Sequence, residues 1–577
     1  MGAAGNARSE QRGRLSVYTQ DFNPVSDSLG LTAIFAVLPV VTLFVLLGGV
    51  KMKAQWAALI SLAVAMLVAL IVYGMPAGQT ALSASEGAVF GFFPIMWIVI
   101  MALWIYNMTV ETGDFAVLRR SFGAISEDQR VQAVIVAFCF GALMEALAGF
   151  GTPVAISSVM LIGLGFRPIK AASLALVANT APVAFGAIAI PIVTLSEITG
   201  LDKGDLGAMV GRQTPFLALV VPLILIAMVD GTRGIRQAWP VAVVGGLAFA
   251  IGQFACSNFV SVEVTDIVAS LFATACIVGL LRVWTPGEPL IADDTRATGR
   301  FERPAAAGAS VHDPVMEREI ARRDGTRPDR TADVLRAYAP YLIIIAVLSI
   351  AQIPAIKNKL AESPWTTTFD WPGLNVQTPD GEAVSSQTFN FNWLPAAGTL
   401  LLISGLLTMA VLRVSPARAL RVLGATVANL RWAIVTVMAV LALAYVMNQS
   451  GQTITLGLWA AGAGGFFAFL SPLIGWLGVA VTGSDTSSNA LFGALQVTAA
   501  KDAGIDQVLL AAGNSSGGVL GKMISPQNLA IGAAAVGMAG QEGELFRKVL
   551  KWSLLLILVM CALVYLQSTA VLAWMVV

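Results

Sequence analysis

The sequence predicts an all-α polytopic membrane protein with about 12 spanning helices and two re-entrant hairpins. Two inverted-topology repeats with broken helices are expected to make up this fold. The 577 residues are 57% hydrophobic and only 12% charged, whereas a soluble domain carries about 25% charged residues. Apolar runs recur along the whole chain, and one polar motif occurs once in each half.

The repeated motif begins with an asparagine and a hydroxyl residue. It reads NTAPVAFGAIAIP at 179–191 and NSSGGVLGKMISP at 514–526, with glycine seven positions and proline twelve positions after the asparagine. A polar break precedes each copy, GTP at 151–153 and GSDTSSN at 483–489. Thr152 and Thr486 of these breaks lie 27 and 28 residues before the asparagines. This paired spacing favours an internal duplication.

Twelve apolar runs approach the length of a spanning helix, which is roughly 20 residues. They lie at 29–50, 54–73, 86–107, 171–195, 206–229, 239–256, 265–282, 337–352, 393–412, 432–449, 506–530 and 549–572. Two further stretches, 131–165 and 466–500, are too long for one span, and a polar break divides each. Short arms around a break predict re-entrant hairpins, which protein or a water-filled cavity must cover.

The Lys and Arg residues of short loops predict the orientation of the chain. Basic loops alternate with loops that lack Lys and Arg, such as 74–85 and 257–264. We place the basic loops in the cytoplasm and both termini outside. The hairpin at 131–165 then enters from the cytoplasm and the hairpin at 466–500 from outside. Inverted copies are typical of secondary transporters with a binding site near the bilayer midplane.

These assignments divide the chain into five segments. They are a polar N-terminal extension at 1–28, a first membrane repeat at 29–229, connecting spans at 230–283, a cytoplasmic loop at 284–336, and a second membrane repeat at 337–577 that includes an external loop at 353–392.

Four helix starts near the middle of the membrane form the predicted site. They are expected at about Pro153, Pro182, Thr486 and Gly517. Each helix N-terminus carries a partial positive charge and free N–H groups, so converging termini favour a small anion such as a carboxylate. Ordinary proline or glycine kinks are the alternative interpretation of these breaks. The residues expected to bind the anion are Thr152, Asn179, Thr180, Ser484, Thr486, Asn514, Ser515 and Lys522. Thr152, Thr180, Ser484 and Ser515 have hydroxyls suited to capping the free N–H groups.

Charged residues within apolar runs are costly and indicate function. Lys522 could hold the carboxylate, although it could instead reach the cytoplasmic face or form a structural ion pair. Asp485 could carry a coupling proton, pair with Lys522, or simply cap its helix. Glu145, in the first arm of the first hairpin, is the second candidate for proton coupling.

Five segments make the sequence resemble the bacterial lactate permease family, which includes glycolate permeases. They are GFGTPVAI (149–156), LGFRP (164–168), ANTAPVAFGA (178–187), GSDTSSNALFG (483–493) and GGVLGKMISPQN (517–528). This resemblance implies proton-coupled uptake of L-lactate, D-lactate and glycolate across the bacterial inner membrane. The layout is also similar to the wider ion-transporter superfamily with inverted hairpin repeats, in which paired Asn-Thr motifs line the carboxylate site. On that pattern Asn179-Thr180 and Asn514-Ser515 take these places, with Ser515 in place of threonine.

The expected function is therefore secondary active transport of short 2-hydroxymonocarboxylates by proton symport. A sodium-coupled or dicarboxylate carrier and an anion channel are the alternatives, and a membrane-bound enzyme is the least supported. No P-loop and no metal-ligand motif is visible, so we expect no catalytic residues, metal or cofactor, with H+ as the coupling ion. The expected partners are the substrate and the lipid bilayer, and nucleic acid is not expected because no basic face is visible. The sequence leaves a monomer and a homodimer equally open.

Overall fold

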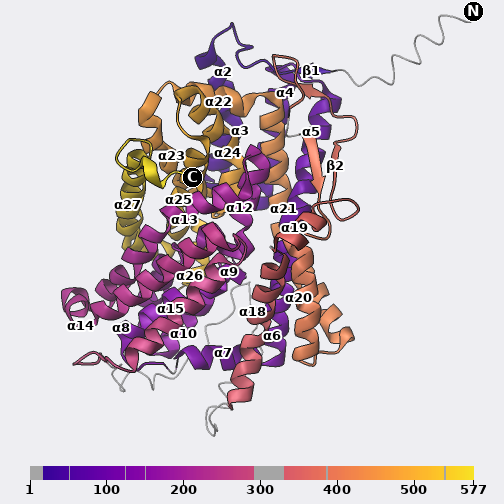
Figure 1. The fold of residues 1–577 in the computed structure, drawn as a ribbon. Coiled ribbons are helices and arrows are strands. Elements are labelled where there is room, and N and C mark those ends of the chain that lie inside the picture. The colour runs from indigo at the N-terminus through magenta and orange to yellow at the C-terminus, as the bar shows by residue number, and fades with distance from the viewer. Residues whose placement is uncertain are drawn as a thin grey trace, which may run out of the picture.

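The computed structural model describes residues 17–50, 52–123, 125–147, 149, 151–290, 330–351, 353–384, 387–538 and 541–577. This part of the chain is almost entirely helical, with four short strands (Figure 1). Residues 1–16 of the predicted N-terminal extension and residues 291–329 of the predicted cytoplasmic loop lie outside the described residues.

The first helical group follows the first two predicted spans closely. It consists of α2 (Leu29–Ala36), α3 (Leu38–Phe44), η1 (Val45–Gly49), α4 (Ala54–Ile71), α5 (Ala77–Phe90), η2 (Gly91–Met96) and α6 (Trp97–Thr112). Phe93 leaves the helical conformation directly before Pro94, because proline disfavours a helical backbone in the preceding residue. The span expected at 86–107 is therefore the second part of a longer, kinked stretch that begins at Ala77.

The second group contains the first predicted hairpin. Its elements are α7 (Asp114–Gly123), α8 (Gln129–Gln132), η3 (Ala133–Phe140), α9 (Gly141–Leu147), α10 (Thr152–Gly163), α11 (Pro168–Ala178), η4 (Val183–Phe185) and α12 (Gly186–Thr199). Elements α8, η3 and α9 follow one another without a break, and α10 packs against both η3 and α9. The two arms predicted at 131–165 thus lie against each other.

The connecting segment consists of α13 (Lys203–Gln213), α14 (Pro215–Phe259) and α15 (Thr265–Leu281). α14 covers the end of one predicted span and the whole of the next, and it is interrupted at Asp230 and Gly231. Gly231 has a φ of 60° and a ψ of −144°, a conformation open almost only to glycine. α14 packs closely against α15, because a Cβ atom on Gly252 would lie 2.9 Å from the Cα atom of Ala269.

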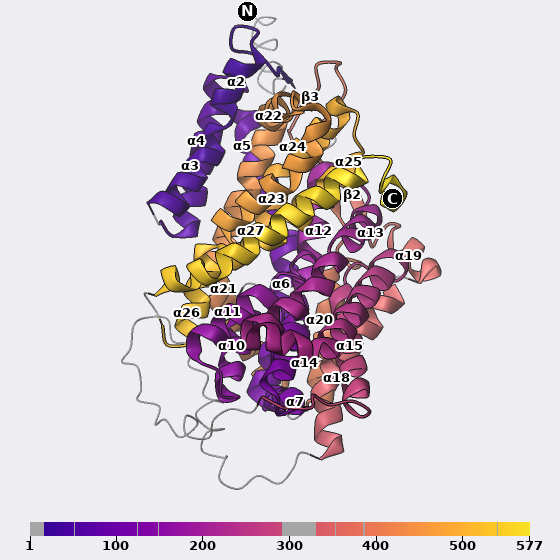
Figure 2. The same ribbon diagram turned by 90° about the vertical axis from the view of Figure 1, so that its left-hand side faces the viewer.

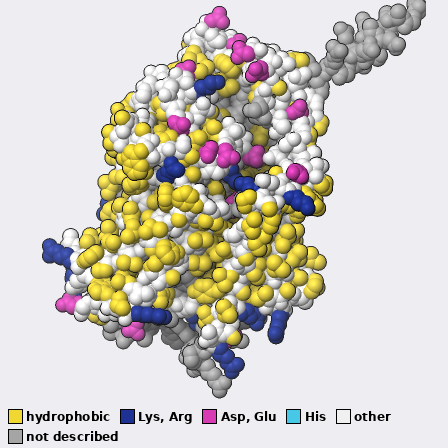
Figure 3. Space-filling model, in the orientation of Figure 1, with side chains coloured by type: hydrophobic (Ala, Val, Ile, Leu, Met, Phe, Trp, Pro, Cys, Tyr) yellow, Lys and Arg dark blue, Asp and Glu magenta, His cyan; other side chains and the backbone are white. Residues whose placement is uncertain are grey.

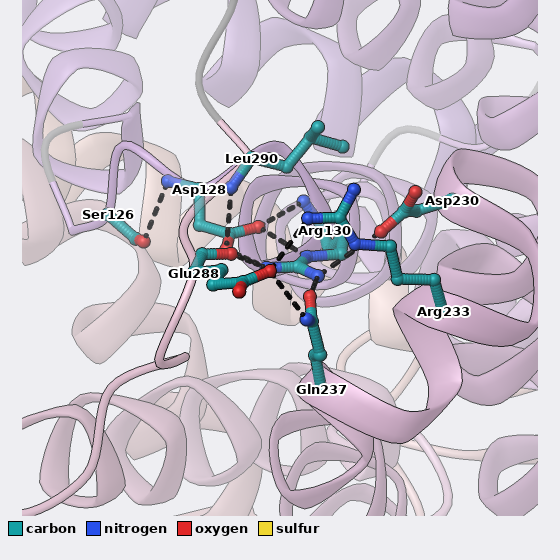
Figure 4. Close-up of polar contacts among 8 residues, drawn as sticks. All are labelled: Ser126, Asp128, Arg130, Asp230, Arg233, Gln237, Glu288 and Leu290. Carbon is teal, nitrogen blue, oxygen red and sulfur yellow. Dashed lines mark hydrogen bonds and ion pairs between the residues drawn. The ribbon is translucent and has the colours of Figure 1, made fainter.

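A buried arginine fixes the chain that follows α15. Arg130 in α8 is only 1% exposed, and its guanidinium donates to Asp128, Asp230 and Gln237 and to the backbone carbonyl of Glu288 (Figure 4). The start of the predicted cytoplasmic loop is therefore attached to α8 and α14. A buried charge is stable in such a setting only when it is fully paired and hydrogen-bonded.

The four short strands form two two-stranded sheets, and Figure 1 labels β1 and β2 in its upper right part. The strands are β1 (Tyr18–Thr19), β2 (Thr367–Asp370), β3 (Val376–Gln377) and β4 (Thr388–Phe391), and two helices precede β2 in the chain, α18 (Thr331–Ala351) and α19 (Pro354–Leu360). β1 pairs in parallel with β3, and β2 pairs antiparallel with β4. The loop predicted at 353–392 is thus structured, and it holds the start of the described chain.

The segment before α2 also covers the ends of two long helices. The hydroxyl of Tyr18 donates to the carbonyls of Tyr73 and Ser450, at 3.2 and 2.9 Å. The amide of Gln20 donates to the carbonyls of Asn448 and Gln449. These bonds satisfy terminal carbonyls that have no partner within their own helix.

The last group contains the second predicted hairpin. It consists of α20 (Ala397–Val411), α21 (Pro416–Ser450), α22 (Gln452–Ala461), η6 (Gly464–Phe466), α23 (Phe467–Thr482), α24 (Asp485–Ala503), α25 (Gln507–Gly521), η7 (Lys522–Ile524), α26 (Pro526–Ala535), α27 (Glu542–Gln567) and η8 (Ala573–Met575). α23 and α24 pack against each other, and both contact α25. α27 runs obliquely across the molecule and contacts α23 and α25 (Figure 2).

In the described part of the chain, nine helical stretches are long and apolar enough to cross a membrane, or ten with one bent pair. The sequence predicts about twelve. Two causes of the difference are visible: Lys203–Phe259 is counted as one stretch, and the apolar helices α15 and α20 are shorter than a full span. Hydrophobic side chains cover much of the face shown in Figure 3, with Lys and Arg along its lower edge.

Candidate functional site

The break predicted after Asn179 is present. α11 ends at Ala178, and the chain that resumes at Val183 is bent by 68° relative to it. Pro182 explains the position of the break, because it has no N–H group to continue the helix and disfavours a helical conformation in Ala181. The prediction of an interrupted helix is confirmed for the first copy of the motif.

The chain after this break contains three consecutive residues with positive φ. Ala187, Ile188 and Ala189 have φ values of 45°, 60° and 57°. This conformation costs residues other than glycine roughly 1–2 kcal/mol each. All three side chains are buried, and strain of this kind clusters at functional sites.

The helix start predicted in the second hairpin is also confirmed. α23 ends at Thr482, and the following Gly483 takes a left-handed φ of 76°. Ser484 then caps α24, because its hydroxyl accepts a hydrogen bond from the backbone N–H of Ser487 at 3.2 Å. Asp485 follows as the first residue of α24 and is buried.

The first hairpin turns at glycine instead of at a capping hydroxyl. Gly151, with a φ of 84°, precedes α10, and Thr152 is already its first helical residue. Thr152 therefore does not cap α10, contrary to the prediction. The hydroxyls of Thr152 and Thr486 have no hydrogen-bond partner in the part of the chain that the structure describes.

The helix start predicted at Gly517 is wrong. α25 runs without a break from Gln507 to Gly521 and carries both Asn514 and Ser515 in its interior. The glycines allow close packing instead of a turn: a Cβ atom on Gly517 would lie 2.2 Å from the carbonyl oxygen of Pro472 in α23. The helix ends at η7, and Pro526 begins α26.

Two further capping predictions are wrong because the hydroxyls donate hydrogen bonds elsewhere. The hydroxyl of Thr180 donates to the carbonyl of Val177 at 2.8 Å, as Ser and Thr side chains often do near a helix end. The hydroxyl of Ser515 donates to the carboxylate of Asp485 at 2.6 Å. Neither hydroxyl accepts a bond from the N–H groups of a new helix.

Glu145 joins the two copies of the motif. Its Oε2 atom accepts a hydrogen bond from the amide of Asn179 at 2.9 Å, and its Oε1 atom lies 2.5 Å from the ammonium of Lys522. All three side chains are buried. A Cβ atom on Gly186 would lie 2.7 Å from Oε1, so this glycine makes room for the carboxylate. Lys522 thus forms an ion pair, but its partner is Glu145 instead of Asp485.

A second polar cluster connects α24 with α25. The amide of Asn489 donates to the hydroxyl of Ser515 at 3.1 Å, and its oxygen accepts from the amide of Asn514 at 2.9 Å. The amide of Gln496 donates to the oxygen of Asn514 at 3.1 Å. Both polar groups of the Asn514 side chain are therefore occupied by α24.

The two clusters meet at Asp485. Asp485 lies close enough to Lys522 and Glu145 for their charges to interact. The Oδ1 atom of Asp485 is buried and has no hydrogen-bond partner within the described residues. The amide of Asn489 also donates to the carbonyl of Pro191 in α12, at 3.1 Å, so α24 contacts the first copy of the motif directly.

Sequence reasoning missed several polar residues of this region. Asn489 and Gln496 follow Asp485 at four and eleven positions, a spacing that places all three on one face of a helix. The predicted helix start at about Thr486 contained that signal. Asn528 has a buried, unpartnered Oδ1 atom, which lies 3.4 Å from the position of a Cβ atom on Gly151. Its position beside the first hairpin could not be read from the sequence.

The structure also shows what the described residues do not form. Among them, no group of three His, Cys, Asp or Glu side chains is arranged to hold a metal ion. The polar groups at the centre are carboxylates, amides, hydroxyls and one ammonium. Such a set recognises a small organic anion by hydrogen bonds and one charge.

The L-lactate permease family model matches residues 32–571. The chain belongs to the L-lactate permease family. The L-lactate permease of Bacillus subtilis (strain 168) is 40% identical over 97% of this chain and all of the relative. Glycolate permease GlcA of Escherichia coli (strain K12) is 39% identical over 96% of this chain and 98% of the relative. MtrF of Neisseria gonorrhoeae aligns at a TM-score of 0.45 with 14% identity over 94% of each chain.

Membership of the L-lactate permease family confirms the resemblance predicted from the five sequence segments. Together with the apolar helices, it makes this chain a multi-pass membrane transporter.

Proposed function

We propose that this chain carries short 2-hydroxymonocarboxylates, lactate and glycolate, across the bacterial inner membrane in symport with protons. The names of its relatives, L-lactate permease and glycolate permease, support this substrate class. The observation that carries the proposal is the buried ion pair between Glu145 and Lys522, next to Asn179 at the helix break.

The ion pair supplies a direct link between proton and substrate. When Glu145 is ionised, its carboxylate forms an ion pair with the ammonium of Lys522 at 2.5 Å. Protonation neutralises Glu145 and releases the ammonium, which can then bind the carboxylate of the substrate. The buried charge of Lys522 stays paired in both states, which avoids the cost of an isolated buried ion. One proton and one monocarboxylate therefore bind together.

The neighbouring polar groups would hold the rest of the substrate. Asn179, released from Glu145 at the same step, has an amide that can bind the carboxylate or the 2-hydroxyl. Thr152 and Thr486 have hydroxyls without partners in the described chain. Thr180, Ser484, Asn514 and Ser515 complete the proposed site, and Asp485 is the second residue proposed for proton coupling, because its Oδ1 atom is free among the described residues.

The proposed cycle uses an inverted-repeat architecture. In it, 131–165 and 466–500 are re-entrant hairpins that enter from opposite sides, within about twelve spans. Hairpins and broken helices would move against the remaining spans and open the site alternately to each side. The contacts within each hairpin and the packing of α12 against α24 support this arrangement. The proposed cycle is compatible with a monomer and with a homodimer.

A sodium-coupled carrier of the same architecture is the second candidate. A dicarboxylate is less favoured, because Lys522 is the one cation seen at the site within the described chain, and it is already paired. An anion channel would let the substrate move only down its gradient. Accumulation against a gradient therefore separates the carrier from the channel.

The experiment is uptake of labelled lactate, glycolate, malate and acetate into proteoliposomes, with and without an inward proton gradient and with sodium present or absent. We expect saturable uptake of lactate and glycolate that the proton gradient drives uphill, without a sodium requirement. Lactate uptake that ignores the proton gradient but needs sodium would contradict the coupling. Absence of lactate and glycolate uptake from correctly oriented protein would contradict the substrate class.

A further inference from the structure

Asp266 is a buried carboxylate that lies outside the site described above. Asp266 in α15 is 1% exposed, and its Oδ1 atom accepts a hydrogen bond from the amide of Gln253 at 2.9 Å. Its Oδ2 atom is buried and has no partner among the described residues. The close approach of α14 and α15 at Gly252 brings these two side chains together.

Gln253 connects this carboxylate with the helix break. Its side chain is fully buried, and its Oε1 atom accepts from the hydroxyl of Thr214 at 3.0 Å. Its amide nitrogen also lies 3.4 Å from the carbonyl oxygen of Ala181, two residues after Asn179. The amide of Gln253 thus donates both to Asp266 and to the backbone carbonyl of Ala181, which lies within the first copy of the motif.

Among the residues that the structure describes, no positive charge compensates Asp266. The titratable groups that interact with it are Glu145 of α9 and Cys256 of α14, and Cys256 in turn interacts with Glu263 in the preceding loop. Among the described residues, the cations near these carboxylates are already paired, Lys522 with Glu145 and Lys203 with Glu263. An ionised Asp266 would be a buried charge without a counter-ion, which is costly, and a bound proton removes that charge.

We propose that Asp266 binds a second proton of the transport cycle and that Gln253 transmits its protonation state to the break at Ala181. The inference rests on the proposed proton symport and adds a site to it. The proton binds the free Oδ2 atom from one side of the membrane and leaves to the other, without any change in covalent bonds elsewhere.

The coupling follows from the strength of hydrogen bonds to charged groups. An ionised Asp266 attracts the amide of Gln253 strongly, because bonds to a carboxylate are roughly twice as strong as neutral ones. A neutral Asp266 competes less, so the amide can shift toward the carbonyl of Ala181. The protonation state of Asp266 therefore changes the restraint on the segment that positions Asn179.

A second proton changes the charge that moves with each substrate. One proton and one monocarboxylate carry no net charge, whereas two protons carry one positive charge inward. Uptake of lactate by the unaltered protein should therefore be stimulated by an inside-negative potassium diffusion potential set with valinomycin. Asp266→Asn, which is neutral and keeps an oxygen for Gln253, should lose this stimulation while a proton gradient still drives uptake.

Asp205→Asn is the matched control, because it removes an exposed carboxylate from α13, and it should retain the stimulation. Gln253→Met keeps Asp266 but removes the link to Ala181, and it should lose the stimulation as well. Unaltered protein that takes up lactate without any response to potential overturns the inference and leaves proton symport intact. Full stimulation in Asp266→Asn, or in Gln253→Met if the first variant does not fold, also overturns it. If the unaltered protein takes up no lactate at all, that result contradicts the proposed function instead.

Discussion

The Oε1 atom of Glu145 lies 2.5 Å from the Nζ atom of Lys522, although 377 positions separate the two residues in the sequence. Both side chains are buried. Glu145 lies in the first predicted hairpin, and Lys522 lies in the second copy of the motif. The pair thus joins the two halves of the chain at the point where the helices are interrupted. Any movement of one half against the other must separate these charges or carry them together.

Replacing Glu145 with glutamine should uncouple transport from protons. The neutral glutamine side chain would mimic the protonated carboxyl group, so the ammonium of Lys522 stays available to the substrate. We expect counterflow exchange of lactate to persist and accumulation driven by a proton gradient to be lost. Glu382→Gln, at an exposed position, is the control and should accumulate lactate normally. Normal accumulation by Glu145→Gln would exclude Glu145 as the coupling residue.

Replacing Lys522 with methionine should remove lactate binding and also destabilise the protein. Glu145 would remain as a buried charge without its partner, which costs about 3–5 kcal/mol. Combining Glu145→Gln with Lys522→Met should recover most of that stability without recovering lactate binding. Thermal unfolding in detergent and binding of labelled lactate measure the two effects separately. Retained binding in the double variant would show that Lys522 has only a structural role.

Replacing Asn514 with alanine should lower the free energy of unfolding by about 1–3 kcal/mol, because the polar groups of Asn489 and Gln496 lose a buried partner. Ser516→Ala is the matched control on the same helix. Its hydroxyl is buried and has no partner within the described residues, so its removal should cost little. Equal thermal unfolding of the two variants would contradict the importance of the polar cluster.

Replacing Gly517 with alanine should destabilise the contact between α25 and α23. The new Cβ atom would lie 2.2 Å from the carbonyl oxygen of Pro472, and relief of that overlap costs about 1–3 kcal/mol. Gly532→Ala in α26 is the control, since its nearest neighbour would be at an ordinary 3.5 Å. The unfolding temperature should fall for the first variant only, and an unchanged value would show that α23 can move aside.

The stability of the loop before α15 should depend on pH through Glu263. Burial by itself raises the pKa of Glu263. The ammonium of Lys203 and the hydroxyl of Ser261 outweigh burial and lower this pKa to about 2. Since this lies below the ordinary value of 4.5, the ionised carboxylate stabilises the fold above about pH 4.5 and loses that effect as pH falls toward 2. Glu263→Gln should lose about 1–3 kcal/mol at neutral pH, and less as the solution is acidified. The unfolding temperatures of the unaltered protein and of Glu263→Gln should be measured from pH 7 downward. A constant difference between them would contradict this assignment.

The sequence predicts the interruptions that depend on local chemistry. Pro182 stops a helix wherever it stands, and Ser484 is an effective cap in any fold, so both positions could be read from the chain. Gly517 could not be interpreted in this way, because glycine serves equally for a turn and for close packing. Only the neighbouring α23 decides between the two. The Glu145–Lys522 pair depends on how the halves meet, which no local pattern encodes.

The hydrogen bonds of Tyr18 and Gln20 have a practical consequence for work with this protein. They attach the chain before the first helix to α21 and to Tyr73, two residues after the end of α4. A purification tag placed before residue 17 leaves this attachment intact, whereas a truncation beyond residue 20 strips two helix ends of their hydrogen-bond donors. Loss of activity after such a truncation would reflect damage to these helix ends and would not test lactate binding.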